Sequence, residues 1–440
     1  MSQFESWKAF LAPKLHRVIE FLASLGITMA GNLFYGFLCV RLLPIPEYAK
    51  FAVVFATLGT ITVLMDISFS TTLLPLIGER IDDRQLIADY VASLRQLAHW
   101  LYLLVAPVTI VVFPIFVHRQ QWSWRVVTGM VVILLLASWC SRVSGAYGAV
   151  LIVRRDRKSW YRAQMISSLG TLTLLGVVHA LHALNAFSAI LVNVTGIIFL
   201  ALTYFLHARG LLGVAGSPSA EKRKAVVHLA LPSVPNVIFY ALQGQISMLL
   251  ITLFGHASEV ASIGALGRLS QIFALFSQMS PLLIEPYFAR LPRGRLQRHY
   301  LGCVAVMVLF CLFIAGLARA FPEIFLWILG SNYSSLRYEV FLIMTASSIA
   351  YLSSGLSFIH YARRFVYWWN GMAVIVLTVA VEICFICKAD LSSIRSILMM
   401  NLWTIAGGLL VNVFTGIYGF VRGPREISES ATVARETNYA

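Results

Sequence analysis

Twelve long apolar segments follow one another along this chain, and they constrain its fold more than any other feature of the sequence. A transmembrane helix needs about 20 mostly apolar residues, and each segment is long enough. None alternates polar and apolar residues as a barrel strand does, and in lipid the backbone must be hydrogen-bonded internally. We therefore predict an all-α integral membrane fold with about 12 transmembrane helices. The segments lie at roughly 19–40, 51–77, 96–117, 126–150, 163–182, 187–207, 226–253, 262–289, 299–320, 338–361, 367–387 and 396–421.

The composition leaves no room for a sizeable soluble domain. Of the 440 residues, 59% are apolar and 12% are charged, whereas soluble domains are about 45–50% apolar and about 25% charged. The sequence contains no H-E-x-x-H, Walker A, G-x-S-x-G or G-x-G-x-x-G motif. The six cysteines lie in apolar segments, where they are expected to act as small core residues. We predict a protein that is not an enzyme and has no metal site and no cofactor.

The chain is strongly basic, with 34 Lys and Arg against 19 Asp and Glu and a net charge of +15. Such an excess occurs in proteins that bind nucleic acids. Here the cations cluster between apolar segments, where they set membrane topology and contact anionic lipid. With the N-terminus inside, the inner connections hold 24 Lys and Arg and the outer ones hold 7. We predict membrane lipids but no nucleic acid as partners, both termini in the cytoplasm, and residues 321–337 at the outer surface.

A short repeat indicates that the chain consists of two halves. PEYAKFAVV at 46–54 and SEVASIGAL at 258–266 share the pattern Glu-x-Ala-x-apolar-small-x-apolar, and each follows the first span of its half. Same-sense halves with a substrate cavity between them are a transporter architecture. We predict two six-helix halves around a central cavity, in four parts: an N-terminal half at 1–207, a cytoplasmic linker at 208–225, a C-terminal half at 226–421 and a disordered tail at 422–440.

Polar side chains recur at helical spacing inside three spans. Arg268, Gln271 and Gln278 share one face of the eighth span, and the seventh span and the first span carry similar stripes. Hydrogen bonds that only hold helices together are one explanation, and a hydrated central cavity is the other, which we favour. The predicted substrate-binding residues are Arg142, Arg268, Gln271, Gln278, Asn236, Tyr240, Gln243 and Asn32.

Two deep charges complete the set of candidates. Arg142 lies twelve residues before the cations that begin at Arg154, which is too deep for its head to reach the interface easily. Asp66 lies fifteen residues into the second segment, where it could bind a coupling ion or pair with a cation or a neighbouring helix end. We predict pairing, because a bare carboxylate repels an anionic substrate.

Four degenerate motifs resemble those of Wzx-type polysaccharide flippases in the MOP exporter superfamily. LLPIPEYAKFAVV resembles the Glu-Tyr-Gly turn of the family, and TVLMDISFSTTLLP resembles its Leu-Asp-x-Gly ending of the second helix. LALPSVPNVIFYAL resembles the start of its seventh helix, and ILGSNYSSL a segment before its tenth. The sequence departs from the family at Ala49 and Ser68, where glycines are usual, and at Ser247, where an acid is common.

The resemblance implies a transporter of the bacterial inner membrane. Its substrate would be an oligosaccharide repeat unit on polyprenyl pyrophosphate, moved from the cytoplasmic to the periplasmic leaflet by alternating access for cell-surface polysaccharide biosynthesis. Polysaccharide polymerase and chain-length machinery would be further partners. Two alternatives are an ion-coupled multidrug exporter of the same superfamily and a membrane-embedded polysaccharide polymerase or ligase. Arg142 and Arg268 favour an anionic substrate over an organic cation.

Overall fold

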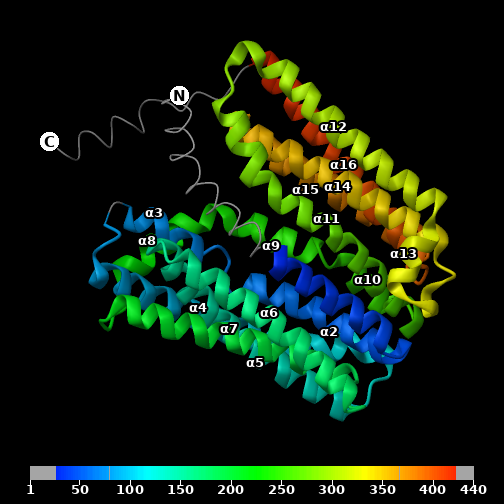
Figure 1. Cartoon of the computed structure of the whole chain (residues 1–440), viewed down its shortest axis with the longest axis horizontal. Coiled ribbons are helices and arrows are strands. Elements are labelled where there is room, and N and C mark those ends of the chain that lie inside the picture. The colour runs from blue at the N-terminus through cyan, green and yellow to red at the C-terminus, as the bar shows by residue number, and fades with distance from the viewer. Residues whose placement is uncertain (1–25, 79, 366, 423–440) are drawn as a thin grey trace, which may run out of the picture. The chain divides into compact units, whose positions relative to one another are not determined.

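The structure is a computed structural model that describes residues 26–78, 80–365 and 367–422. Throughout these ranges the regular elements are α-helices and short 3-10 helices, and no strand occurs among them (Figure 1). Among the described residues, ten helices are long and apolar enough to cross a membrane, and a shorter apolar helix spans Gly26–Leu42. The predicted all-α, multi-pass membrane fold is therefore confirmed, while the number of twelve spans stays a prediction.

In the N-terminal part of the chain, a turn interrupts the helix predicted for the second span. After Gly26–Leu42 come α2 (Ile45–Leu64), η1 (Ser70–Thr72), α3 (Leu73–Ile77), α4 (Arg84–Val117), η2 (His118–Gln120), α5 (Trp124–Val153), α6 (Arg157–Ala180) and α7 (Ala186–Leu212). The predicted segment 51–77 is wrong as a single helix, because the backbone leaves helical geometry after Leu64. Ile67 and Ser68 have φ values of 38° and 63°, which no α-helix accommodates.

The C-terminal part contains a second interrupted segment. Its elements are α8 (Ala220–Ala230), η3 (Leu231–Ser233), α9 (Val234–Gln243), α10 (Ile246–Phe254), α11 (Ala257–Arg290), α12 (Arg293–Ala320), α13 (Pro322–Leu329), η4 (Ser331–Tyr333), α14 (Arg337–Ala362), α15 (Trp368–Lys388) and α16 (Ile394–Arg422). The predicted run 226–253 is divided among α8, η3, α9 and α10. Pro232 and Pro235 lie at the start of η3 and α9, where proline is tolerated, and both remove a backbone donor.

Close contacts divide the chain into two compact units, each described by itself. The first runs to Arg268 and includes Ser392–Ile394, and the second comprises Leu269–Leu391 and the chain from Arg395. In the first unit α5 packs against α4 and α7, and α6 packs against α7. In the second unit α12 and α13 pack against α14. The predicted division at 208–225 stays a prediction.

The glutamate of the first repeat motif joins two helices of the first unit. The Glu47 carboxylate accepts a hydrogen bond from Lys50 Nζ at 2.6 Å and one from the backbone N–H of Ala186 at 2.9 Å. Ala186 is the first residue of α7, and the N–H groups in the first turn of a helix have no hydrogen-bond partner inside that helix. Glu47 therefore satisfies one of these groups and fixes α2 against the start of α7.

The segment between α7 and α8 lies on the first half of α4. The Asp89 carboxylate accepts hydrogen bonds from Lys222 Nζ at 2.6 Å and from the backbone N–H of Ser217 at 2.9 Å. One turn further along α4, Ser93 Oγ accepts the N–H of Ser219 at 3.2 Å. Gly216 lies directly against the α4 backbone at Ala88, where a Cβ atom would have no space. We call residues 215–223 the docked linker.

Candidate functional site

Arg142 lies near the middle of α5 and is held by an aromatic ring. Its Cζ atom is 3.8 Å from the centroid of the Trp139 ring, one helical turn earlier. Its Nε atom is buried with no hydrogen-bond partner among the described residues. No described carboxylate lies within ion-pair distance of Arg142. The guanidinium is therefore half-buried and its charge is not neutralised by any described part of the chain.

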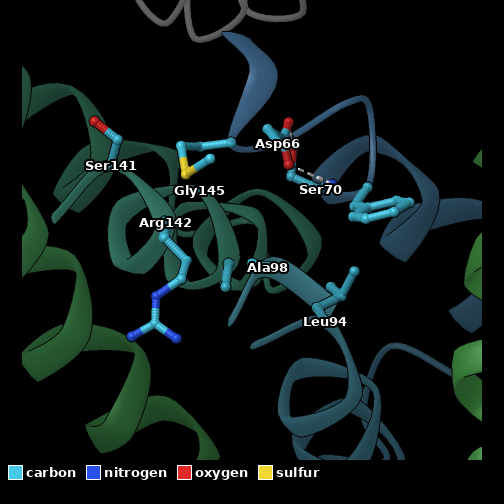
Figure 2. A pocket seen from close by; sticks show the side chains of 10 residues that line it. Asp66, Ser70, Leu94, Ala98, Ser141, Arg142 and Gly145 are labelled. Carbon is cyan, nitrogen blue, oxygen red and sulfur yellow. Dashed lines mark hydrogen bonds between the residues drawn. The ribbon is translucent and has the colours of Figure 1, made fainter. Parts of the chain in front are cut away.

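A small pocket lies beside Arg142 (Figure 2). The accessible volume of the pocket is about 10 Å³, which is enough for roughly one water molecule. Figure 2 shows the Arg142 guanidinium pointing away from Asp66, although both residues line the pocket. The pocket is lined by Met65, Asp66, Phe69, Ser70, Leu94, Ala98, Ser141, Arg142, Gly145 and Ala146. It is far too small for a sugar, so it forms at most one side of a substrate site.

Asp66 holds the turn that follows α2. Its carboxylate accepts hydrogen bonds from the backbone N–H of Ser70 at 2.9 Å and from Ser70 Oγ at 2.6 Å (Figure 2). Ser70 is the first residue of η1, so Asp66 meets the exposed donors at a helix start. Asp66 thus acts here on a neighbouring helix end, and its role in transport stays a prediction.

A helical face of α4 adds polar and aromatic groups around Arg142. His99 and Tyr102 lie three positions apart, and their ring centroids are 5.9 Å and 5.2 Å from that of Trp139. Arg95 lies one turn before His99, with its Cζ 5.7 Å from the Tyr147 ring of α5. We call Arg95, His99, Tyr102, Trp139 and Arg142 the Arg142 cluster.

The charged members of the Arg142 cluster are both arginines, although the Asp66 carboxylate, which is bonded to Ser70, lines the same pocket. Arg95 is near enough to Arg142 for their positive charges to repel each other. The nearby acid Asp89 pairs with Lys222, and Asp82 with Arg154 at 3.3 Å. The cluster can therefore attract an anion, because its own charges have no carboxylate partner among the described residues.

The sequence did not single out Arg95 and His99. Both lie at the start of the predicted segment 96–117, where a cation is normally explained by topology. The spacing of Arg95, His99 and Tyr102, which places them on one helical face, was the signal that could have found them.

Arg268 is packed in the interior of the first unit. It is 4% exposed, and its Cζ is 4.0 Å from the Phe55 ring centroid and 5.5 Å from that of Phe51. Gly36 on the opposite helix lies so close that a Cβ there would be 2.9 Å from Arg268 Cδ. A substrate could reach this guanidinium only after these neighbours move apart.

The structure does not bring Arg142 and Arg268 together. The contacts of Arg142 are with α4 and its own helix, whereas those of Arg268 are with α2 and Gly26–Leu42. Both lie in the first unit but in different surroundings.

The other predicted residues are placed as follows. Asn236 and Tyr240 are exposed on α9, and Gln243 at its end is half-buried. Asn32 is exposed on Gly26–Leu42. Gln271 is half-buried and belongs to the second unit. The side chain of Gln278 lies outside the described residues. The substrate-binding role of all of them stays a prediction.

Solved transporter structures share the arrangement of this chain. The lipid II flippase MurJ in an inward closed conformation matches with a TM-score of 0.66 over 90% of this chain and 87% of its own, at 12% identity. The chain has the MATE/MurJ fold. An inward-facing MATE multidrug resistance transporter of the MOP superfamily gives 0.61 over 90% and 94%, at 13% identity. The eukaryotic MATE transporter AtDTX14 gives 0.61 over 94% and 96%, at 12% identity. No protein-family model matches the sequence, and neither does any curated protein.

The MATE/MurJ fold by itself does not establish the function or the substrate. The structural neighbours named above are transporters and a flippase rather than enzymes. Identities of 12–13% support the fold alone, and one fold hosts many substrates. The substrate has to be argued from the side chains.

Proposed function

We propose that this protein is a flippase for a polyprenyl-pyrophosphate-linked oligosaccharide repeat unit. It moves the unit from the cytoplasmic to the periplasmic leaflet of the bacterial inner membrane by alternating access, for cell-surface polysaccharide biosynthesis. The MATE/MurJ fold and the motif resemblance to Wzx-type flippases support a transporter of this kind.

The observation that carries the proposal is the unpaired charge of Arg142. An ionised side chain within a membrane span costs roughly 2.5–3.5 kcal/mol on insertion scales, and the Arg142 charge has no described carboxylate to offset this. Guanidinium groups bind phosphate oxygens through planar, charge-assisted hydrogen bonds. A substrate that carries pyrophosphate supplies the missing anion and at the same time needs such a group, because lipid tails cannot solvate it.

Export of organic cations is the second candidate, since MATE transporters give a TM-score of 0.61 against 0.66 for the flippase. Such an exporter requires an accessible carboxylate within the spans. Asp66 is the acid that lines the pocket beside Arg142, and both of its oxygens accept hydrogen bonds from Ser70. Asp66 is therefore engaged in holding a turn, which favours the anionic substrate.

Deletion of the gene in its host tests the proposal. We expect a lipid-linked sugar to accumulate on the cytoplasmic leaflet, where extraction and mass spectrometry identify it, and the wild-type gene to restore export. Arg142→Ala should not restore export although the protein reaches the membrane, because a charged hydrogen bond to phosphate contributes roughly 1.5–3 kcal/mol. Arg142→Lys should restore it in part, since it keeps the charge but loses the planar fork.

Arg119→Ala is the matched control, because Arg119 is exposed in η2, just beyond the opposite end of α4. It should restore export fully. Loss of resistance to organic cations on deletion, with no accumulated lipid-linked sugar, would contradict the proposal and favour the multidrug exporter.

A further inference from the structure

Two arginines of the first unit, one on α4 and one on α5, lie beside aromatic rings, whereas three other cations of this unit pair with carboxylates. Lys50 pairs with Glu47 at 2.6 Å, Lys222 with Asp89 at 2.6 Å and Arg154 with Asp82 at 3.3 Å. Arg95 and Arg142 have aromatic neighbours but no described carboxylate within ion-pair distance. Their mutual repulsion is therefore left uncompensated.

The aromatic rings fix how Arg142 can bind. The Arg142 Cζ atom lies over the Trp139 ring at 3.8 Å from its centroid, so this ring restricts where the guanidinium can move. The Nε atom of Arg142 and the Nδ1 atom of His99 are both buried without a hydrogen-bond partner in the described chain. Buried polar atoms in native proteins are normally satisfied. A group with several acceptor oxygens could satisfy Arg142 Nε after a small local movement, and also His99 Nδ1 in the tautomer that carries the proton on that atom.

The surrounding surface is apolar and can therefore accommodate a ligand that carries an apolar chain. Trp139 is 40% exposed, and on α4 Trp100, Leu103 and Leu104 are 49%, 55% and 65% exposed. An inorganic anion would gain nothing from this apolar surface, whereas an acyl or prenyl chain could lie along it.

We propose that Arg95 and Arg142 together form a binding site for a lipid-borne phosphate group, with His99 as a third polar contact and Trp139 as the support of Arg142. The phosphate can belong to a prenyl pyrophosphate or to an anionic phospholipid, which share the same chemistry. The inference deepens the proposed function. Binding of a prenyl pyrophosphate at this site rests on that function, whereas binding of a phospholipid does not.

Arg223 of the docked linker adds to the positive potential nearby. Its Nη1 donates to the neutral Gln96 side chain at 2.7 Å, and its Cζ is 5.4 Å from the Trp100 ring. Gln96 and Trp100 each follow a residue of the cluster by one position on α4, so Arg223 lies over the adjoining helical face. Its charge is expected to strengthen anion binding without direct contact.

The test measures binding of defined lipids to the purified full-length protein. Farnesyl pyrophosphate and phosphatidylglycerol are the two probes, and farnesol and phosphatidylcholine are their controls. Native mass spectrometry and titration calorimetry give the affinities. We expect at least one anionic probe to bind tightly, each of Arg95→Gln and Arg142→Gln to weaken it about tenfold or more, and the double variant to abolish it.

Matched variants separate binding from folding. Arg119→Gln, which removes an exposed cation from η2, should bind like the wild type. Arg95 is exposed, so Arg95→Gln leaves the core intact, and Arg142→Lys keeps the charge and should bind at an intermediate level. Equal binding by the wild type and the double variant would overturn the inference, as would equal binding of farnesol and farnesyl pyrophosphate with no binding of phosphatidylglycerol.

The outcomes also separate the inference from the proposed function. If the variants lose binding of phosphatidylglycerol but not of farnesyl pyrophosphate, the site is a phospholipid site. This result would remove its support for pyrophosphate transport. Loss of farnesyl pyrophosphate binding would support both. If the double variant binds both lipids like the wild type, the inference is overturned. If the gene deletion still causes a lipid-linked sugar to accumulate in the host, the flippase proposal remains intact.

Discussion

At the scale of single residues, the same type of polar side chain has quite different surroundings in different parts of this protein. Arg268 is enclosed by Phe51 and Phe55, whereas Arg142 shares a partly exposed face with Arg95. The sequence treated both arginines as equivalent candidates, because each lies inside an apolar segment. Depth along a span can be read from sequence, but the identity of the facing side chains cannot.

Asp66→Asn tests whether the deep acid holds a turn. Asn keeps one acceptor for Ser70 but loses the charge and the second acceptor, so we expect the free energy of unfolding to fall by about 1 kcal/mol. Thermal unfolding in detergent measures this change. Affinity for the anionic lipids should remain as in the wild type. A large change in affinity with unchanged stability would instead place Asp66 at the substrate.

At the scale of helices, a close crossing and the docked linker hold the first unit together. Gly264 on α11 faces α2 and α10, where a Cβ would lie 2.6 Å from Ala52 Cβ and 3.3 Å from Met248 Cε. Small residues permit such close approach between transmembrane helices. The docked linker has a different origin, since hydrogen bonds and one ion pair hold it on α4.

Gly264→Ala should lower the free energy of unfolding by about 1–3 kcal/mol, because the added methyl group overfills the crossing. Gly267, one turn later on the same helix, has no atom within 4 Å of an added Cβ. Gly267→Ala should therefore be neutral or stabilising by about 0.5–1 kcal/mol, since alanine favours the helix. Thermal unfolding of the two variants under the same conditions compares them. Equal effects at both positions would mean that the crossing is looser than described.

Asp89→Asn should release the docked linker. The substitution removes the ion pair with Lys222 while leaving an oxygen that can accept from Ser217. We expect faster hydrogen exchange of the backbone amides at 215–223, measured by mass spectrometry, with α5 unchanged. Asp82→Asn is the control, because that side chain is 96% exposed and its ion pair does not involve the linker. Unchanged exchange at 215–223 would show that the remaining contacts are sufficient.

At the scale of the whole chain, the sequence was sufficient to predict the helical membrane fold. It was not sufficient to predict where the helices are interrupted. Segment length and apolarity predicted the helices, because a bilayer demands both. The break after Leu64 was missed, because Asp66, Ile67 and Ser68 contain no proline or glycine to mark it. The Arg142 cluster was found only in part, since His99 and Trp139 meet only through the packing of α4 against α5, which the sequence does not specify residue by residue.

Topology is the expectation that concerns the whole chain. A single cysteine at Ser217, in a cysteine-free background, should react with a membrane-impermeant maleimide only when the cytoplasmic face is open to it. A cysteine at Ser335 should react from the outside in intact spheroplasts. Both side chains are exposed in the structure, so access depends on the side of the membrane. Labelling of Ser217→Cys from outside would reverse the predicted orientation.

The turn after α2 has a practical consequence for anyone who purifies this protein. Ser68 is in the left-handed region with φ of 63°, where a side chain costs roughly 1–2 kcal/mol that glycine avoids. Ser68→Gly should therefore raise the free energy of unfolding by about 0.5–1 kcal/mol after the greater freedom of the unfolded glycine is allowed for. Ser68→Ala, which keeps the Cβ, should give no gain. A shift in melting temperature for glycine alone would provide a thermostabilised variant for crystallisation or cryo-electron microscopy, with the Arg142 cluster untouched.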